Sequence, residues 1–450
     1  MYPYIFKNLI NPFYETVIKR RKMLDYRRFL EESQWWPAEK LRNYQREELK
    51  RLLKHAYEQC RFYRETFEKL DLTPEAVNKY EAFRRLPIIE KADIRARKED
   101  MIAGNWRGKT WTKSTGGSTG VPLELDYTPE SYDWRVAAWK RGYAWAGCED
   151  GMRQVWIYGG DVGSPSAFSQ WKKRLHERIY GRVTFDCFYL TEERMRECLN
   201  FIRRYRPRVI VGYTNSLYDF AKFVKTSGGL GFKLQSVITA AEKLHEFQRQ
   251  DMEEVFQCGV YHTYGCREFM LIAMECPERS QMHLTSENLF VEIIKEDGTP
   301  AGPGEIGDVV ITDLHNYGMP FIRYRIGDMA VASDHVCPCG RGLPMIRDVT
   351  GRTADLIKAL DGKAVSGVFF PHLMKELKSV ERFQVIQNRI DELEIKIVKT
   401  PEWGDSDMKF LDGEVRKVMG NEVQINYDFV PDIPLTPTGK YRVTVSNLKE

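Results

Sequence analysis

Short apolar segments alternate with helical stretches from about residue 110 to residue 350, and this alternation constrains the fold more than any other feature of the sequence. The apolar segments are RQVWIYGG, PRVIVGY, SVITAAE, GVYHTYG, LFVEII and GDVVITDL. Strands separated by helices predict an α/β body with a largely parallel sheet. Functional residues of such a body are expected on loops at the ends of the strands.

The segments on either side of this body have a different pattern. The first 80 residues place apolar side chains near helical spacing with charges between them, which predicts a packed helical cap. A chain of 450 residues usually needs more than one core. We therefore expect a large N-terminal α/β domain over residues 1–350, with its cap at 1–80, and a small α+β C-terminal domain over 351–450. The elements expected in the small domain are a helix at 366–379, a hairpin at 382–399, a helix at 405–419 and a strand at 422–430.

Charge and cysteine content exclude several classes of protein. The formal net charge is only +4, which does not indicate nucleic-acid binding. The nine cysteines are unevenly spaced, no signal peptide is recognisable, and no apolar run is long enough for a transmembrane segment. These features favour a cytoplasmic protein with reduced thiols. We expect either a monomer or a homodimer. The opening MYPYIFKNLINPFYETVIKRRK is aromatic and basic, so it fits an ordinary docking helix, which we favour, or contact with a membrane surface.

The stretch KSTGGSTGVPLELDY, residues 113–127, is unusually rich in glycine and hydroxyl residues. A surface turn needs fewer glycines, and a Walker-type loop would need a Gly-Lys-Ser/Thr ending before a helix, whereas Val121, Pro122 and a strand-like segment follow here. The remaining interpretation is a hairpin-like phosphate clamp, in which glycines let the backbone approach an anion and the hydroxyls of Thr115, Ser118 and Thr119 donate hydrogen bonds.

Four further motifs follow this loop in a fixed order. They are TYGCREF with Glu268, MPFIRYRIGD with Asp328, TGRTADLI with Arg352 and PLTPTGKYRV with Lys440. In this order, after a Ser/Thr/Gly loop, they resemble the motifs of the adenylate-forming enzymes, the superfamily of acyl-CoA synthetases and adenylation domains. The chain is most similar to the phenylacetate-CoA ligase and CapK-type branch, whose members also have counterparts of LKHAYEQCRFYRETF and FRRLPIIEKADIR. The resemblance covers nearly the whole chain.

The resemblance implies ATP/AMP and Mg²⁺ as ligands and assigns a role to each motif. Glu268 would hold Mg²⁺, with a salt bridge to a nearby arginine as the alternative explanation of this residue. Asp328 would accept the ribose hydroxyls, assisted by Arg352, and both oxygens of a carboxylate suit that task. The remaining nucleotide contacts that the resemblance implies are the β- and γ-phosphates at Thr115, Gly116, Gly117, Ser118, Thr119 and Gly120, the adenine at Tyr264 and Gly265, and the purine edge at Glu242 of ITAAE.

Lys440 lies on a TPTGK loop of the small domain, far along the chain from the phosphate loop. A lone lysine near the end of a chain is usually solvated charge. The resemblance instead implies that its ammonium bridges the acyl carboxylate and the α-phosphate during adenylation. It would leave when the mobile small domain rotates about a hinge near residues 352–355.

Three positions depart from the pattern of the family. Gly116 stands where a serine is common, Val121 where a basic residue is common, and Ala354 where the hinge carboxylate is usual, with Asp355 one place later. One hydroxyl and one cation are therefore missing beside the triphosphate. These departures leave open a degenerate nucleotide-binding protein without catalysis.

A second constellation is separate from the nucleotide motifs. Cys276 and His283 lie in MECPERSQMH, and Cys337 and Cys339 lie in VCPCGRG. Two pairs of soft or borderline ligands, with glycine directly after the Cys-x-Cys, favour a structural zinc site over a disulfide or unmetallated loop cysteines. Cys258 and Cys266 are the substitutes if one ligand is wrong.

The function that these motifs favour is an ATP-dependent carboxylic-acid ligase. It would form an acyl-adenylate with release of pyrophosphate and transfer the acyl group to coenzyme A. The alternative acceptor is an amine or a sugar hydroxyl, as in CapK-like conjugate formation. Residues 156–161 and 212–220 are candidates for the wall of the acyl pocket, and their tyrosine and tryptophan content suits a flat acid or an ordinary core.

Overall fold

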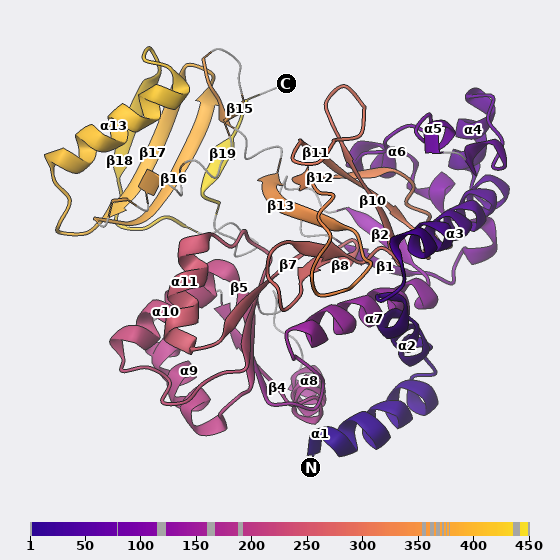
Figure 1. The fold of residues 1–450 in the computed structure, drawn as a ribbon, viewed down its shortest axis with the longest axis horizontal. Coiled ribbons are helices and arrows are strands. Elements are labelled where there is room, and N and C mark those ends of the chain that lie inside the picture. The colour runs from indigo at the N-terminus through magenta and orange to yellow at the C-terminus, as the bar shows by residue number, and fades with distance from the viewer. Residues whose placement is uncertain are drawn as a thin grey trace. The chain divides into compact units, whose positions relative to one another are not determined.

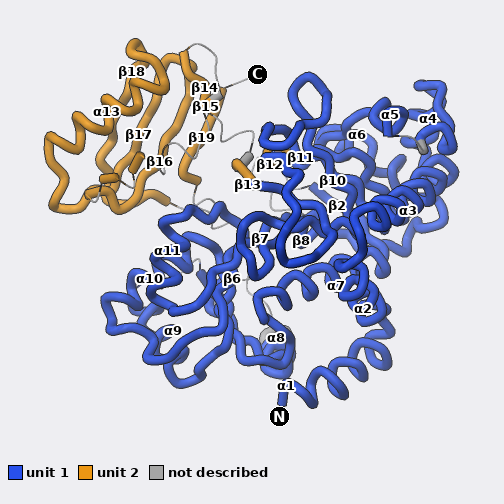
Figure 2. Tube along the Cα trace, in the orientation of Figure 1, with its two compact units in different colours: residues 1–326, 331–348 blue, residues 327–330, 349–450 orange. Residues whose placement is uncertain are grey.

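The computed structural model describes an α/β protein (Figure 1), and the expected fold class is confirmed. The described residues form two compact units, Met1–Ile326 with Val331–Asp348 and Gly327–Ala330 with Val349–Glu450 (Figure 2). The sequence placed residues 327–330 in the large domain. They group with the second unit because they lie beside the continuation of the chain after residue 348, where Thr350 donates a hydrogen bond to the Met329 carbonyl at 3.3 Å. The structure describes residues 2–78, 80–114, 123–159, 167–187, 192–352, 357–360, 364–365, 370, 373–374, 376–377, 379–434 and 442–448.

The beginning of the first unit is helical, as expected. Within the cap, the extended backbone of Cys60 separates the helices that end at Gln59 and begin at Arg61. No helix in the described part of the chain is long and apolar enough to cross a membrane. The helices are α1 (Tyr2–Ile5), the π-helices η1 (Phe6–Ile10) and η2 (Phe13–Ile18), α2 (Met23–Ser33), α3 (Ala38–Gln59), α4 (Arg61–Lys69), the 3₁₀ turn η3 (Ala76–Asn78), α5 (Tyr80–Phe83), α6 (Lys91–Met101) and the 3₁₀ turn η4 (Gly104–Trp106).

Five parallel strands form one half of an eleven-stranded sheet. Their neighbours are β3–β4, β3–β5, β5–β6 and β6–β7, and helices α8 to α11 connect them in sequence. This alternation is the one that the sequence predicts. The strands are β3 (Gln154–Tyr158), β4 (Arg182–Asp186), β5 (Val209–Tyr213), β6 (Ser236–Ala240) and β7 (Gly259–Cys266), and the helices are α8 (Ala167–Ile179), α9 (Glu192–Tyr205), α10 (Thr214–Thr226) and α11 (Glu246–Phe256).

The other half of the sheet is not parallel, so the expectation of a largely parallel sheet holds for only part of it. LFVEII and GDVVITDL form an antiparallel hairpin, and residues 295–305 between them are rich in Gly and Pro and contain no helix of the kind that usually connects parallel strands. The sheet order is β10-β11-β12-β13-β9-β8-β7-β6-β5-β3-β4. These strands are β8 (Met270–Glu275), β9 (Met282–Leu284), β10 (Leu289–Ile294), β11 (Ile306–Asp313), β12 (Tyr324–Ala332) and β13 (Met345–Arg352).

Both faces of the parallel strands are buried, as their continuous apolar sequences require. Val155 and Ile157 of β3 pack on one face with α9, α10 and α11, whereas Trp156 packs on the other with Tyr143 of α7 (Pro129–Trp145). The helical cap joins the second face through Ser33 of α2, whose hydroxyl bonds the buried Glu287 carboxylate at 2.7 Å. Arg141 of α7 pairs with the same carboxylate at 2.6 Å, so the cap, helix and sheet share one buried ion pair.

The second unit follows the α-β-β-α-β order expected from the sequence, apart from the first helix, most of which lies outside the described residues. α13 (Asp405–Met419) buries Leu411, Val415 and Met419, spaced four residues apart, against Ile395 of the sheet. The four-stranded sheet has the order β18-β17-β16-β19. Its strands are β16 (Val380–Arg389), β17 (Glu392–Lys399), β18 (Gln424–Phe429) and β19 (Thr444–Ser446), and a small hairpin joins β14 (Ile357–Lys358) to β15 (Ala364–Val365).

Candidate active site and metal cluster

The carboxyl ends of adjacent parallel strands hold several residues singled out in the sequence. β3 ends at Tyr158, β5 ends at Tyr213, Glu242 follows the end of β6, and Tyr264 lies near the end of β7. The parallel register brings these ends to one edge of the sheet. Ligands of open α/β sheets bind outside this edge, which makes it the candidate active site.

Aromatic rings form one wall at this edge. The rings of Tyr158 and Tyr213 meet edge to face with their centroids 4.5 Å apart, and both side chains are half-buried. Trp156 lies two residues earlier on the same strand, and its ring is 5.7 Å from that of Tyr158. The two stretches proposed for the acyl pocket therefore meet, although residues 160–161 lie outside the described part of the chain.

Glu242 ties the end of β6 to the start of α10. One of its carboxylate oxygens accepts a hydrogen bond from the backbone N–H of Asn215 at 2.9 Å, and its carbonyl accepts one from the Thr214 hydroxyl at 2.8 Å. A carboxylate at a helix N-terminus satisfies an otherwise unpaired N–H group. The side chain thus holds the segment after β6 in place at the candidate site.

Tyr264, Gly265 and Glu268 are brought together by the tight turn between β7 and β8. A β-bulge falls between Tyr264 and Gly265, and a Cβ atom on Gly265 would lie 2.0 Å from the Met270 carbonyl, so only glycine fits. Glu268 is buried, and its backbone carbonyl accepts a hydrogen bond from the Tyr127 hydroxyl at 3.1 Å. Within the described part of the chain no ion pair includes its carboxylate.

The phosphate-clamp stretch is carried by an antiparallel hairpin. β1 (Trp111–Ser114) pairs with β2 (Glu124–Tyr127), and the pair Ser114 with Glu124 closes the ladder. Thr115, Gly116, Gly117, Ser118, Thr119 and Gly120 lie outside the described residues. The base of the hairpin is held by Asp126, whose carboxylate accepts from the Thr112 hydroxyl at 2.6 Å and lies 3.6 Å from the Lys98 ammonium.

Lys113 is a cation at this hairpin that sequence reasoning missed. Its ammonium lies 4.2 Å from the centre of the Tyr132 ring and 5.7 Å from that of Tyr127. Burial, followed by the nearby Arg135 and Arg267, lowers the pKa of Lys113 from its usual value. The only sequence feature that pointed to Lys113 was its position two residues before Thr115. A strand lysine next to a loop has no distinctive spacing by which it could be recognised.

The remaining nucleotide candidates fall in or next to the second unit. Asp328 lies inside β12 and not on a loop at a strand end, and it directly follows Gly327, whose φ of 86° places it in the left-handed region. Arg352 is the last residue of β13. Lys440 lies outside the described residues, as do Ala354 and Asp355 at the expected hinge.

Cys276, His283, Cys337 and Cys339 form a compact cluster. Their ligand atoms all lie within 4.8 Å of one another. The sulfur atoms of Cys276 and Cys337 are 3.5 Å apart, and the Cys339 sulfur is 3.4 Å from Nε2 of His283. Ligand atoms of a tetrahedral zinc site, bound at about 2.0–2.3 Å, stand about this far apart, so the spacing fits such an ion.

The histidine of this cluster is set up to be a ligand. Nδ1 of His283 faces the Leu343 carbonyl at 3.4 Å, which leaves Nε2 directed at the cysteines. Burial lowers the pKa of His283 to about 4, so the imidazole is neutral near pH 7. A neutral imidazole and three thiols within reach of one point are chemically suited to zinc.

The cluster joins three separate segments of the first unit. Cys276 directly follows β8, His283 lies on β9, and the two other cysteines lie on the loop before β13. That loop is also fixed to the helical cap, because the Arg341 guanidinium bonds the Gln34 amide oxygen at 3.0 Å and lies 4.6 Å from the centre of the Trp35 ring. An ion here would cross-link the end of β8 and strand β9 to the loop before β13, which is distant from them in sequence.

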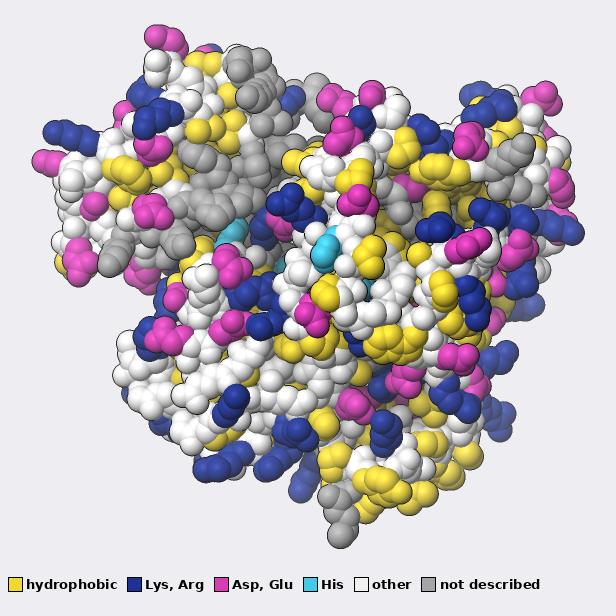
Figure 3. All heavy atoms as spheres, viewed as in Figure 1, with side chains coloured by type: hydrophobic (Ala, Val, Ile, Leu, Met, Phe, Trp, Pro, Cys, Tyr) yellow, Lys and Arg dark blue, Asp and Glu magenta, His cyan; other side chains and the backbone are white. Residues whose placement is uncertain are grey.

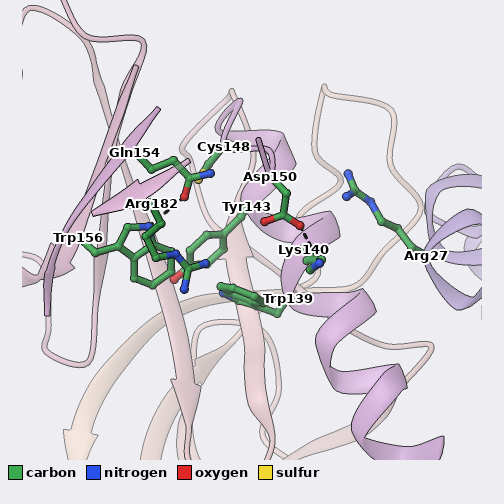
Figure 4. A pocket seen from close by; sticks show the side chains of 9 residues that line it. All are labelled: Arg27, Trp139, Lys140, Tyr143, Cys148, Asp150, Gln154, Trp156 and Arg182. Atoms are coloured by element: carbon green, nitrogen blue, oxygen red, sulfur yellow. Dashed lines mark hydrogen bonds and ion pairs between the residues drawn. The ribbon is translucent and has the colours of Figure 1, made fainter. Parts of the chain in front are cut away.

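A small pocket lined by aromatic and charged side chains lies at the opposite edge of the parallel strands (Figure 4). It is lined at the beginning of β3 and β4 by Gln154 and Arg182, and the Arg182 guanidinium lies 4.0 Å from the centre of the Trp156 ring. Asp150 pairs there with Lys140 of α7 at 2.6 Å. Since the groups contact one another and the pocket lies away from the carboxyl ends, we interpret it as part of the scaffold.

Comparisons with known proteins agree with this geometry. Residues 357–447 match the family model described as the CapK C-terminal domain. Phenylacetate-coenzyme A ligase of Thermus thermophilus is 25% identical over 90% of this chain and 94% of its own length. Protein CapK of Staphylococcus aureus is 24% identical over 86% of this chain and 85% of its own length.

Solved structures extend the likeness to the fold. A crystal structure of 2-hydroxyisobutyryl-CoA ligase, in the postadenylation state in complex with R3-HIB-AMP, aligns with a TM-score of 0.71 and 17% identity, covering 90% of this chain and 89% of that one. The resemblance to the phenylacetate-CoA ligase and CapK branch of the adenylate-forming enzymes, inferred from the motifs, is confirmed.

Proposed function

We propose that this chain, which resembles the phenylacetate-CoA ligase and CapK branch along most of its length, is an ATP-dependent carboxylic-acid ligase that works through an acyl-adenylate. The observation that carries the proposal is the agreement between the ordered motifs and relatives that cover about nine-tenths of the chain. The carboxylate would attack the α-phosphorus of ATP and release pyrophosphate. The acceptor would then attack the acyl carbon and release AMP.

The candidate residues are proposed to divide the work of the first step. An anion must approach an anionic phosphorus, so donors and cations have to neutralise the charge that develops. The loop 115–120 would hold the β- and γ-phosphates, and Lys113 is a further cation at its base. Glu268 would hold Mg²⁺, and its burial without a cation partner among the described residues supports this assignment over a structural salt bridge.

The nucleoside and the acid would lie at the carboxyl edge. Tyr264 and Gly265 would face the adenine, Glu242 would border it, and Asp328 with Arg352 would bind the ribose. The pair of Tyr158 and Tyr213 rings would line the acyl pocket and favours a flat acid. Lys440 would bridge the carboxylate and the α-phosphate in the first step only.

We propose that the acceptor is coenzyme A and that the protein works in the cytoplasm. Its thiol would replace AMP on the acyl carbon and give a thioester. An amine or sugar hydroxyl is the second candidate. The match of residues 357–447 to the CapK C-terminal domain supports this alternative.

We propose that Cys276, His283, Cys337 and Cys339 bind a structural zinc ion. Their mutual distances and the orientation of the imidazole support this, and no step of the reaction is assigned to the ion. Elemental analysis of protein purified without chelator should find about one equivalent of zinc. Less than a few tenths of an equivalent of any transition metal contradicts the assignment.

An acid-dependent ATP–pyrophosphate exchange assay over a broad panel of carboxylates tests the function. Exchange with at least one acid in the absence of any acceptor is the expected result. Adding coenzyme A, an amine or a sugar in parallel reactions then identifies the acceptor by the product that forms. Nucleotide binding without exchange for any acid would instead indicate the degenerate nucleotide-binding protein.

A further inference from the structure

The segment formed by residues 2–22 docks on the molecule through one face only. Phe6 is buried against Tyr180 with ring centroids 5.0 Å apart, and Glu15 is buried with its carboxylate 3.1 Å from the Tyr180 hydroxyl. Tyr2 donates a hydrogen bond to the Ile179 carbonyl at 2.6 Å. These contacts place the segment beside the end of α8 (Figure 1), and they agree with the docking helix expected from the sequence.

The other face of this segment is apolar and exposed. Leu9, Phe13 and Val17 recur every four residues, and their exposed fractions are 67%, 57% and 57%. More than half of the exposed large apolar side chains among the described residues lie on this segment and on α8. We call these the apolar face: Tyr2, Tyr4, Ile5, Leu9, Phe13, Val17, Ile18, Trp171, Leu175 and Ile179.

Basic side chains surround the apolar face. Residues 2–22 contain five basic side chains and one acidic one, and α8 contains four and one, which gives net charges of +4 and +3. The whole chain carries only +4, so the remainder is net negative. The acid of residues 2–22 is the buried Glu15, and Arg21 lies 3.6 Å from it. The exposed charge beside the apolar face is therefore almost entirely positive, from Lys7, Lys19, Arg20, Lys22, Lys172, Arg174 and Arg178.

A space-filling view shows the apolar face together with the basic side chains around it. Apolar side chains gather at the lower end of the molecule, where Figure 1 places α1 and α8, with lysine and arginine side chains around them (Figure 3). Helices that lie in a membrane interface combine an apolar face rich in aromatic residues with lysine and arginine at its border. Basic residues near such a face are attracted to anionic lipids.

We propose that the apolar face binds the surface of a membrane containing anionic lipids. A second copy of the chain fits less well, because a symmetric contact through this face would bring two strongly positive surfaces together. The segment also contacts the loop that precedes β3 and the end of α8 that precedes β4, since Lys7 lies 3.4 Å from Glu149 and Tyr2 contacts Ile179. Binding there leaves the carboxyl edge of the parallel strands free to meet dissolved ATP and acid.

The proposal is independent of the ligase assignment and is tested by co-sedimentation of the full chain with vesicles. Vesicles of phosphatidylcholine containing about one quarter phosphatidylglycerol should bind the protein, and pure phosphatidylcholine should bind it at least tenfold more weakly. Leu9→Glu with Phe13→Glu should reduce binding at least tenfold, because each change puts a charge into the lipid contact. Lys19→Glu with Arg20→Glu should reduce it several-fold and remove most of its salt dependence.

Ile390→Glu is the matched control, since Ile390 is 41% exposed on the turn between β16 and β17 and should leave binding unchanged. Thermal melting shows whether each variant is folded, and Leu9→Gln provides a milder change if the glutamate variant melts early. Absence of binding to the anionic vesicles overturns the proposal. So does binding that survives both pairs of substitutions, or a dimer in solution that the Leu9 and Phe13 changes dissociate, which would assign the face to a second copy.

Discussion

The candidate metal site and the candidate nucleotide site differ in how they are assembled. The four candidate ligands of the metal site come from one compact unit, and their ligand atoms lie within 4.8 Å of one another in the described structure. The nucleotide candidates come from loop 115–120, the edge of the sheet, β12 and the small domain, so they are divided between two units. A structural site gains from being preformed, whereas a site that runs two steps gains from parts that can change places. The predictions below test this difference.

Removal of Lys440 should have the largest effect. Lys440→Ala should slow adenylation about 10²–10³-fold, because a cation is lost where charge develops, and should leave ATP binding nearly unchanged. The second step, started from a supplied synthetic acyl-adenylate, should run at near wild-type speed. Single-turnover kinetics of each half-reaction measure both.

Lys417→Ala, on the exposed end of α13, is the control and should change neither step. Equal slowing of both steps by Lys440→Ala would mean that the lysine is structural or that the small domain does not rotate between the two steps. No slowing of either step would mean that the resemblance misplaces the catalytic lysine.

A change in the candidate metal site should act on stability and not on one half-reaction. Cys337→Ser should release the metal and lower the free energy of unfolding by a few kcal/mol, out of the roughly 10–16 kcal/mol that structural zinc contributes in small domains. Metal content and thermal unfolding measure this. Cys258→Ser, which changes a half-buried cysteine outside the cluster, should keep the metal. Full metal content in Cys337→Ser would remove that residue from the site.

The ribose contact should have a smaller effect, confined to nucleotide binding. Asp328→Ala should weaken ATP binding by about 1.5–3 kcal/mol, the value of a charge-assisted hydrogen bond, which corresponds to about 10–150-fold in Kd. Deoxy-ATP should bind the variant and the wild type more nearly alike. Calorimetry measures both affinities, with Asp391→Ala in the turn after β16 as the control. Unchanged ATP affinity would exclude Asp328 from the site.

The last prediction concerns a histidine outside both sites, whose effect is confined to the pH dependence of stability. Burial lowers the pKa of His315 to about 3, and its Nε2 lies 3.0 Å from the Glu287 carbonyl. His315 of the unfolded chain takes up a proton below about pH 6.5, whereas the buried side chain of the folded protein stays neutral down to a much lower pH. The free energy of unfolding is therefore unaffected by this histidine above about pH 6.5 and decreases as the pH falls below that value. The free energy of unfolding should drop by about 2 kcal/mol between pH 7 and pH 5 from this residue. Denaturant unfolding should show a smaller drop for His315→Gln, and an identical drop would contradict the assignment.

The sequence predicted helices and strands well where the spacing of apolar residues and the residues typical of turns indicated the same element. α13 has the bounds that the sequence predicts, 405–419, and the hairpin of β16 and β17 lies where alternation placed it. The direction of β10 and β11 was harder to infer, because apolar segments look alike in parallel and antiparallel pairs. The signal was the Gly- and Pro-rich connection over residues 295–305, which has no helical pattern.

Some site residues could be predicted from their spacing in the sequence, whereas others depend on contacts that only the folded chain makes. Paired spacing alone brought out the four residues of the candidate metal site, because a shared metal ligand set would require two short motifs to converge, and the structure brings their ligand atoms together. Lys113 was missed because its environment is made by Tyr127 and Tyr132, which only the folded hairpin and α7 bring to it. The exposure of Leu9 and Phe13 likewise depends on which face of the segment packs on Tyr180.

The central claim is that the acid is activated as an acyl-adenylate, and the fate of the acid's own oxygen tests it most directly. With an acid selected by pyrophosphate exchange and labelled in both carboxylate oxygens with oxygen-18, the AMP released in the complete reaction should carry one labelled oxygen. The carboxylate oxygen that attacks the α-phosphorus stays with AMP when the acceptor takes the acyl group. Mass spectrometry of the AMP reads this out. Unlabelled AMP, or label found in inorganic phosphate, would contradict the account.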